Sequence, residues 1–182
     1  MEHQEQALLK RVTEFHGHTC PGLIVGYRVA LAALGRIGSR RAEDEELVAV
    51  VENDSCAVDA IQVILGCTFG KGNLVFRDYG KHVYTFYRRD AEGRAVRIRV
   101  KRPRLPDGAS RDEVMRALLE ASESELLSVT EVDAPAPGPA RIEPSLPCAQ
   151  CGEETMESRL RRHGDVLVCI PCWEKLGGGS EM

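Results

Sequence analysis

Hydrophobic and polar positions in the first third of the chain predict three helices and one strand. Residues 4–15 carry an apolar stripe at helical spacing, and Pro21 suits the first position of a longer helix that runs to about residue 37. Residues 47–51 form an apolar run typical of a buried strand. Residues 56–65 are apolar on nearly all sides of a predicted helix, which indicates burial.

The middle of the chain predicts a sheet with one face toward solvent. Val96, Ile98 and Val100 alternate with basic residues, as expected for an antiparallel strand that is half buried. A helix should follow the strands, with Asp112 and Glu113 in its first turn. The expected strands and helix span residues 73–77, 82–88, 94–102 and 110–127.

These elements predict an α+β fold, with helices and an antiparallel sheet mixed in one core domain. Five prolines between residues 134 and 147 indicate a linker, and a small treble-clef zinc finger is expected after it. The expected bounds are 1–133 for the core domain, 134–147 for the proline-rich linker, 148–176 for the finger and 177–182 for a disordered tail.

Two CxxC pairs in the C-terminal segment predict a structural zinc site. Cys148 and Cys151 form the first pair, Cys169 and Cys172 form the second, and seventeen residues separate them. This spacing is typical of four-cysteine zinc sites, in which two tight turns complete a tetrahedron around one ion. The alternative interpretation is two redox-active pairs. A segment this short buries little surface, so zinc is expected to supply its stability.

The charge of the finger favours a protein partner over nucleic acid. Four basic residues stand against six acidic ones between residues 148 and 182, before the charge of the thiolates is counted. Binding to a phosphate backbone requires the opposite balance.

A second cluster of potential metal ligands lies at His16-Gly-His18-Thr-Cys20. In an extended stretch, the three side chains at alternate positions would point the same way. In a helical stretch, only His16 and Cys20 would share a face. Cys20 also precedes a predicted helix, where the helix dipole favours a thiolate.

Cys56 stands at the start of the next predicted helix and is expected to complete this core site. Asp59 lies three residues further on along the same helical face. Asp54 and Cys67, which flank the helix, are further candidate members. The same residues could instead form a reactive thiolate site. The core metal is left open, with zinc as one candidate.

The loop that contains Lys71 resembles a phosphate-binding loop only in part. Three residues rather than four separate its first glycine from the Gly-Lys pair, and Gly72 follows the lysine where Ser or Thr is required. A weaker role remains, in which Lys71 contacts an anionic ligand.

Composition sets the broad class of the protein. The 182 residues carry a formal net charge of −4 and are 43% hydrophobic, which is normal for a soluble globular chain. The N-terminal stretch lacks the apolar region of a signal peptide, and no apolar run is long enough to cross a membrane. We therefore expect a cytoplasmic protein in which the seven cysteines serve as ligands or reactive thiols rather than disulfides.

The segments FHGHTCPGLIVGYR and VENDSCAVDAIQVILGCTFGKGNLVFRDYGKHVYTFY, followed by the cysteine-rich tail, resemble the E-subunit family of formylmethanofuran dehydrogenase. The resemblance covers residues 15–172. It implies an α+β core, intertwined homodimers and, in some members, an added treble-clef finger. It also implies metal binding at the core motifs, carried here by His16, His18, Cys20 and Cys56.

The family takes its name from a molybdenum or tungsten enzyme of methanogenesis. The chain carries no cysteine array for iron–sulfur clusters and no recognisable pterin-binding signature, so it is not expected to perform that redox reaction alone. The leading hypothesis is a metal-binding accessory or regulatory protein. The alternative is an enzyme that uses the core Cys/His site on a small-molecule substrate.

Overall fold

The computed structural model describes residues 2–38, 40–90, 94–101 and 108–178 and divides the chain into two compact units. The core unit comprises Met1–Ala140 and the finger unit comprises Arg141–Met182. Each unit is described by itself. Among the described residues, no helix combines the length and the apolar character needed to span a membrane.

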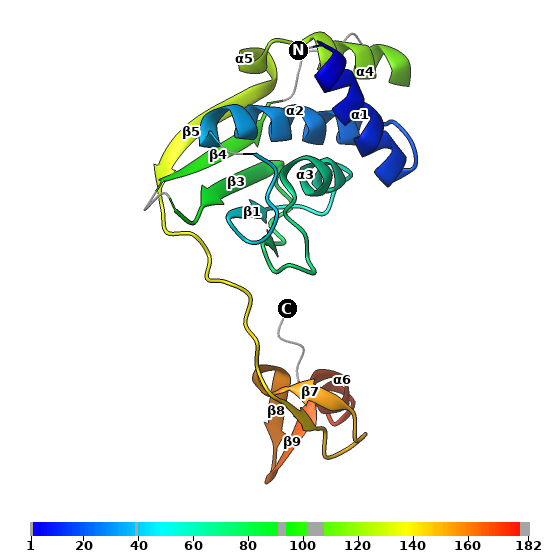
Figure 1. Cartoon of the computed structure of the whole chain (residues 1–182). Helices are drawn as coiled ribbons and strands as arrows, with labels where there is room; N and C mark the ends of the chain where they lie inside the picture. The colour runs from blue at the N-terminus through cyan, green and yellow to red at the C-terminus, as the bar shows by residue number, and fades with distance from the viewer. Residues whose placement is uncertain (1, 39, 91–93, 102–107, 179–182) are drawn as a thin grey trace. The chain divides into compact units, whose positions relative to one another are not determined.

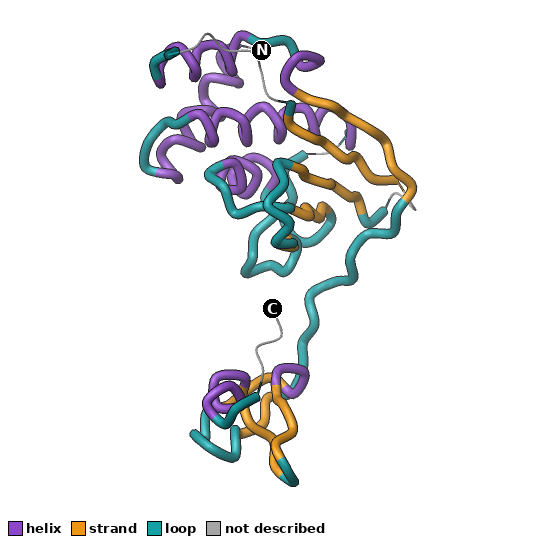
Figure 2. The backbone as a smooth tube through the Cα atoms, turned by 180° about the vertical axis from the view of Figure 1, so that it is seen from behind, coloured by secondary structure: helices purple, strands orange, loops and turns teal. Residues whose placement is uncertain are grey.

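The core unit is a five-stranded sheet with helices gathered on one side (Figures 1 and 2). The strand order is β2-β1-β3-β4-β5, with β2 parallel to β1 and every other pair antiparallel. Mixed helices and sheet in one core confirm the predicted α+β class. The strands span Leu47–Val51 (β1), Leu74–Phe76 (β2), Val83–Arg88 (β3), Arg94–Val100 (β4) and Leu127–Asp133 (β5). The helices span Glu2–His16 (α1), Pro21–Ile37 (α2), Ala57–Leu65 (α3), Arg111–Glu120 (α4) and Glu123–Leu126 (α5).

The predicted helix over residues 110–127 is wrong in its second half. The helix ends at Glu120, and Ser122 begins the separate short helix α5. The Ser122 side chain accepts a hydrogen bond from the Glu125 backbone N–H, while the Glu125 carboxylate accepts one from the Ser122 N–H. This capping box requires an extended backbone at Ser122, which interrupts the helix. The chain then enters β5, an edge strand that the hydrophobic pattern did not predict.

Glycines allow α2 and α3 to pack unusually closely. A Cβ atom placed on Gly26 would lie 2.2 Å from the Ala57 carbonyl oxygen, closer than any real contact allows. A Cβ atom on Gly22 would lie 3.3 Å from the Cys56 Cβ atom. The two glycines are four residues apart, so they lie on the same face of α2. The first turn of α3 therefore sits directly against the first turns of α2.

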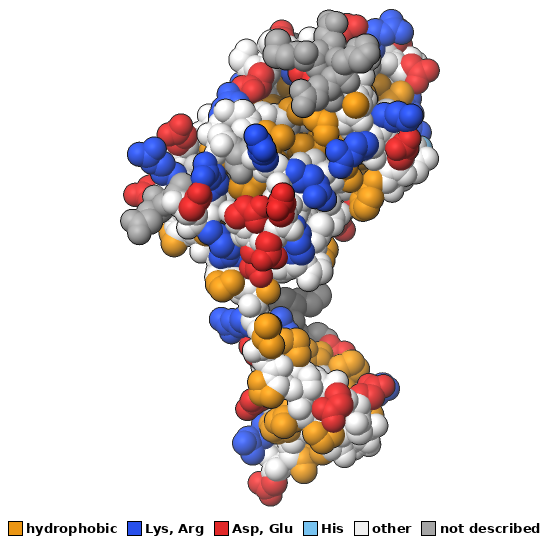
Figure 3. Space-filling model, in the orientation of Figure 1, with side chains coloured by type: hydrophobic (Ala, Val, Ile, Leu, Met, Phe, Trp, Pro, Cys, Tyr) orange, Lys and Arg blue, Asp and Glu red, His pale blue; other side chains and the backbone are white. Residues whose placement is uncertain are grey.

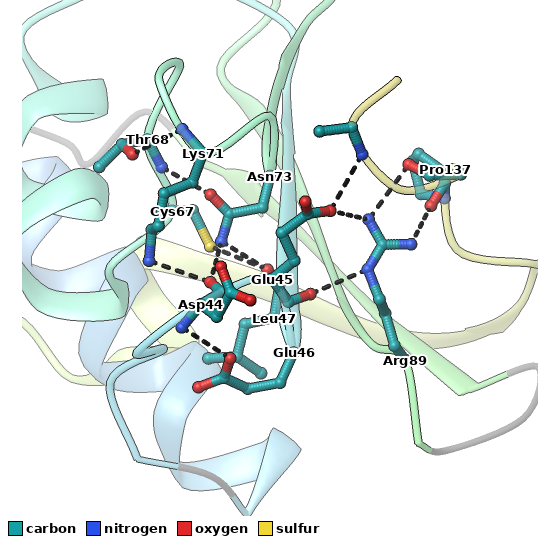
Figure 4. A network of polar contacts seen from close by, with 12 residues as sticks. Asp44, Glu45, Glu46, Leu47, Cys67, Thr68, Lys71, Asn73, Arg89 and Pro137 are labelled. Carbon is teal, nitrogen blue, oxygen red and sulfur yellow. Dashed lines mark hydrogen bonds and ion pairs between the residues drawn. The ribbon is translucent and has the colours of Figure 1, made fainter. Parts of the chain in front are cut away.

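The first part of the proline-rich segment belongs to the core unit. The Arg89 guanidinium donates to the carbonyls of Pro137 and Gly138 as well as to Glu45, and the Glu45 carboxylate accepts from the Ala140 N–H (Figure 4). Residues 145–147, at the other end of the segment, form strand β6 of the finger unit. The freely connecting part of the segment is thus shorter than residues 134–147.

The finger unit is built from two small hairpins and one short helix. Strand β6 pairs with β7, and β8 pairs with β9 across a turn at Gly164. The chain turns back through Gly177 and Gly178, whose backbone N–H groups donate to the Glu174 and Trp173 carbonyls. Residues 179–182 of the expected disordered tail lie outside the described residues. The elements are Ser145–Pro147 (β6), Glu154–Met156 (β7), Glu157–Arg159 (η1), Leu160–His163 (β8), Val166–Cys169 (β9) and Ile170–Lys175 (α6).

Candidate metal centres

The core site begins at the turn between α1 and α2. His16 is the last residue of α1, and Gly17 then takes a positive φ of 89° that reverses the chain. Cys20 is the N-cap of α2, where its sulfur accepts a hydrogen bond from the Leu23 backbone N–H at 3.3 Å. The stretch is therefore neither the extended nor the helical form considered from the sequence. It nevertheless brings the Cys20 sulfur to 3.9 Å from the His16 Nε2 atom.

Cys56 joins these two residues because α3 packs so closely on α2. It is the N-cap of α3, and its side chain makes no capping hydrogen bond of its own. One ligand atom from each of His16, Cys20 and Cys56 lies within 4.8 Å of the other two. In a tetrahedral zinc site, a sulfur and a nitrogen ligand are separated by about 3.6 Å. The cluster needs only a small contraction to hold such an ion.

A carboxylate behind His16 fixes the orientation of its ring. The Asp59 Oδ2 atom lies 2.7 Å from His16 Nδ1, and the Asp59 Oδ1 atom accepts a hydrogen bond from the Gln62 amide. With the proton on Nδ1, the Nε2 lone pair is directed toward the cysteine sulfurs. Metal-ligating histidines commonly have such a carboxylate partner, which raises their basicity. Asp59 is thus placed to position a ligand rather than to act as one.

The sulfurs of the core site are poised against each other in the absence of a cation. Burial raises the pKa of the Cys56 thiol, and the neighbouring Cys20 side chain raises it further. Two thiolates this close repel each other, and a divalent cation would remove the repulsion. The donor set of two sulfurs and one imidazole suits zinc, which also binds such ligands in closed structural sites.

The structure does not bring every candidate residue into this cluster. The His18 ring lies against the His16 ring, with centroids 4.6 Å apart, but His18 is not among the three residues whose ligand atoms converge. The turn at Gly17 explains the difference, because His16 and His18 no longer alternate along an extended strand. Asp54 is exposed and lies beside the cluster without joining it.

Cys67 and Lys71 belong to a separate structural network (Figure 4). Cys67 is fully buried, its thiol donates to the Leu47 carbonyl at 3.7 Å, and burial raises its pKa to about 12. The Lys71 ammonium donates to three backbone carbonyls of residues 42–44. These bonds use all three ammonium hydrogens, which corrects the expectation of an anion contact. Lys71 instead holds the chain that leads into β1.

A pocket of about 460 Å³ opens beside the core cluster. His16, Cys56 and Asp59 line one part of it, and Phe69 and Phe76 line another. Neither phenylalanine was predicted as a site residue. Phe69 lies in the loop between α3 and β2, and Phe76 ends β2, so neither belongs to a recognisable motif.

The four finger cysteines form a second cluster. Their sulfurs lie within 4.8 Å of one another, and those of Cys151 and Cys169 are 3.8 Å apart. Tetrahedral zinc with bonds of about 2.3 Å separates its sulfur ligands by about 3.8 Å, so the donor set fits zinc closely. Cys148, Cys169 and Cys172 are buried, whereas Cys151 is exposed.

Backbone N–H groups prepare Cys148 to be a thiolate. Although burial opposes ionisation, hydrogen bonds from the backbone of Cys151, Cys169 and Gln150 lower the pKa of Cys148 to about 6. The hydrogen bond from the Cys172 thiol to Cys169, together with burial, raises the pKa of Cys172 to about 12. Without a cation, the cluster therefore shares its protons unequally. Zinc favours all four thiolates because each gains a metal bond.

The fold and the two clusters define a class of α+β protein that joins a Cys/His core site to a C4 finger. Residues 15–132 match the family described as FmdE, molybdenum formylmethanofuran dehydrogenase operon, and residues 138–176 match the prokaryotic dksA/traR C4-type zinc finger. Because the first match covers well over half of the chain, the protein belongs to the FmdE family.

Two similar proteins extend this result. An FmdE-like protein of the tungsten formylmethanofuran dehydrogenase type, from Syntrophus aciditrophicus, has the same fold, with a TM-score of 0.71 at 21% identity, covering 98% of this chain and 94% of that one. A probable S-adenosyl-L-methionine-binding protein from Archaeoglobus fulgidus is 37% identical over 97 residues, which are 51% of this chain. The matched region is 26% of that relative, so the chain spans about a quarter of its length.

Proposed function

We propose that the protein is a metal-binding accessory protein whose core site holds one metal ion through His16, Cys20 and Cys56. The convergence of these three ligand atoms carries the proposal. Asp59 would orient His16, and the α2 and α3 N-termini would stabilise the two thiolates. The bound ion would supply Lewis acidity at the edge of the pocket. Zinc is the candidate that best fits the donor set.

The finger would hold a second, structural zinc through its four cysteines. The C4 match and the tetrahedral sulfur spacing both support this role. The order of its parts, with a CxxC turn, a hairpin and a helix that carries the last ligand, supports the treble-clef assignment. A site closed by four protein ligands has no position for substrate.

The accessory role rests on the family and on what the chain would need for redox chemistry. The family and the fold relative are named for a formylmethanofuran dehydrogenase, and this chain lacks a recognisable site for its iron–sulfur or pterin groups. The Archaeoglobus relative is named for binding a small molecule, which supports a ligand in the core pocket.

The site can be tested by metal analysis of the purified full-length protein. We expect two zinc equivalents per chain in the wild type and one in the Cys20→Ser and Cys56→Ser variants, with the finger zinc retained. Anomalous scattering would assign the metal and its ligands at each site. Two equivalents in Cys20→Ser would contradict the core assignment. Formylmethanofuran or formate oxidation by the isolated chain would contradict the accessory role.

A second function is favoured by one specific observation. The core cluster has three protein ligands among the described residues, whereas a closed zinc site has four, and His16 and Cys56 both line the pocket. Such a site suits an enzyme that binds a small substrate at the metal. Coordination of a water molecule as the fourth ligand would support this interpretation, and a fourth protein ligand would oppose it.

The remaining expectations concern partners and location. We propose a homodimer, a protein partner for the finger and a cytoplasmic location. Basic and acidic side chains are interspersed on the visible face of the core unit (Figure 3), which supports neither a nucleic-acid nor a membrane partner. Sedimentation at two protein concentrations would test the dimer.

A further inference from the structure

The pocket beside the core cluster combines features that specify its ligand. Its volume of about 460 Å³ falls within the range of small-molecule sites. Its lining joins ligand residues of the metal site to polar side chains and to aromatic rings. The chemistry of each part limits what can bind.

Two aromatic rings form the apolar part of the pocket. Phe69 is 65% exposed and Phe76 is 39% exposed, although phenylalanine normally gains free energy from burial. Both rings line the same hollow, together with Val58. A planar group placed there would cover them and gain the stacking contacts that aromatic pairs provide.

Carboxylates form the charged part. Asp54 and Asp59 line the pocket, and no lysine or arginine is among the described residues that do so. A divalent cation bound by two thiolates and a neutral imidazole would carry no net charge, so the carboxylates would leave the pocket negative. The positive end of the α3 dipole is already matched by Cys56 and Asp59 in its first turn. Anionic ligands are therefore disfavoured.

The metal site forms the third part. His16 and Cys56 belong both to the cluster and to the pocket wall, while the third ligand residue, Cys20, lies buried behind them. A ligand in the pocket is therefore adjacent to the ion. A nitrogen, oxygen or sulfur donor on that ligand could complete the coordination.

We propose that this pocket binds a neutral or cationic small molecule that carries a planar ring and a donor atom for the metal. The ring would lie against Phe69 and Phe76, and the donor would reach the ion beside His16 and Cys56. The proposal rests on the proposed core metal site. The polar groups at the metal end distinguish this small-molecule site from an apolar surface for a second copy of the chain.

The test uses the cobalt-substituted full-length protein, because cobalt reports ligand exchange in its visible spectrum. 4-Phenylimidazole supplies a neutral ring and a nitrogen donor, imidazole supplies the donor alone, and benzoate supplies a ring with an anionic donor. We expect 4-phenylimidazole to bind about tenfold more tightly than either of the others. The closed finger site should not change its spectrum.

Variants locate the binding. Phe69→Ala and Phe76→Ala should each remove most of the tenfold preference for 4-phenylimidazole over imidazole. Tyr79→Ala is the matched control, since Tyr79 is also an exposed aromatic residue, at 60%, but does not line the pocket. Asp54→Asn should strengthen benzoate binding without changing imidazole binding. All four side chains lie at the surface, so the variants should fold, and circular dichroism would verify this.

The outcomes separate this inference from the metal site itself. If only one cobalt equivalent binds per chain, the proposed core metal site fails. If two bind but 4-phenylimidazole shows no advantage, or Tyr79→Ala weakens it as much as Phe69→Ala, the ligand class is overturned. A preference for benzoate would overturn the charge argument. Loss of dimerisation in Phe69→Ala with unchanged probe binding would assign the rings to a contact between copies and overturn the proposal.

Discussion

The core unit and the finger unit use the same residue type, cysteine, inside two different sources of stability. The core unit buries large apolar side chains such as Leu23, Ile61, Tyr84 and Phe86 in one continuous cluster. The buried cluster of the finger consists of Val168 and three cysteines, with Trp173 packed against it. The core can fold by apolar burial, whereas the finger depends on ligand bonds to a metal.

The difference teaches how to interpret a metal site from its surroundings. A cluster that supplies most of the buried residues of its unit holds the unit together. A cluster at the N-termini of two helices that are already packed adds chemistry to a fold that exists without it. Changes to either unit can break this contrast, and they are taken from the largest expected effect to the smallest.

Loss of one finger ligand should unfold the finger alone. Cys148→Ser removes a zinc bond from a unit with little other buried surface, and zinc contributes on the order of 10 kcal/mol or more to such modules. Hydrogen exchange should show loss of protection over residues 145–176. Cys20→Ser is the matched change in the core, where serine is also a favourable N-cap, so the core should stay protected.

The opposite pattern would reverse the assignment of structural and functional metal. Protection retained in the Cys148→Ser finger would show that its fold does not need the ion. Global unfolding of Cys20→Ser would show that the core does.

The core should instead be sensitive to the close contact between α2 and α3. Gly26→Ala would place a methyl group 2.2 Å from the Ala57 carbonyl oxygen, and we expect it to lower the free energy of unfolding by about 3 kcal/mol. Gly35→Ala is the matched control in the same helix, because nothing lies within 4 Å of its Cβ position. It should raise stability by up to about 1 kcal/mol. Urea denaturation would measure both, and equal effects would refute the packing argument.

Asp59 should tune the core metal without holding it. Asp59→Asn keeps the size of the side chain but weakens the charged contact to His16, so metal affinity should fall by about 10- to 100-fold. Asp54→Asn, five residues earlier on the same segment, should leave affinity unchanged. Competition with a chelator would measure both. Complete loss of the metal in Asp59→Asn would identify Asp59 as a ligand.

The elements with strong local signals could be predicted from the sequence. Pro21 and Gly38 bound α2 as expected, and the CxxC spacing located the finger. The end of α4 was also encoded locally, because Ser122 and Glu125 form a capping box, but the helical pattern around it concealed the signal. Strand β5 requires β4 as a neighbour, and such pairing is not visible in a single segment.

The core site was only partly predictable for a related reason. His16 and Cys20 are close in sequence, but their contact with Cys56 depends on how near α3 approaches α2, which Gly22 and Gly26 control. The exclusion of His18 follows from the reversal at Gly17, which alternation along a strand could not reveal. The positions of side chains between elements depend on packing, and sequence periodicity describes only one element at a time.

The smallest expected effect concerns Cys67, a core cysteine that serves neither metal site. Burial raises its pKa in the folded protein to about 12, whereas an unfolded thiol ionises near pH 8.5 to 9. The unfolded state therefore loses its proton first as the pH rises, and the stabilising contribution of the neutral thiol declines from about pH 8.5 toward 12. Between pH 8 and 9.5 this should cost about 1 kcal/mol.

Comparison with Cys67→Ala isolates this contribution, because all other titrating groups are shared by the two proteins. The difference in their free energies of unfolding, measured in urea at pH 8 and pH 9.5, should shrink by about 1 kcal/mol. Iodoacetamide should also fail to alkylate native Cys67 at pH 8, even after a chelator has unfolded the finger. A difference that does not depend on pH, or rapid alkylation, would show that the thiol reaches solvent. The core would then rely less on apolar burial than its contrast with the finger requires.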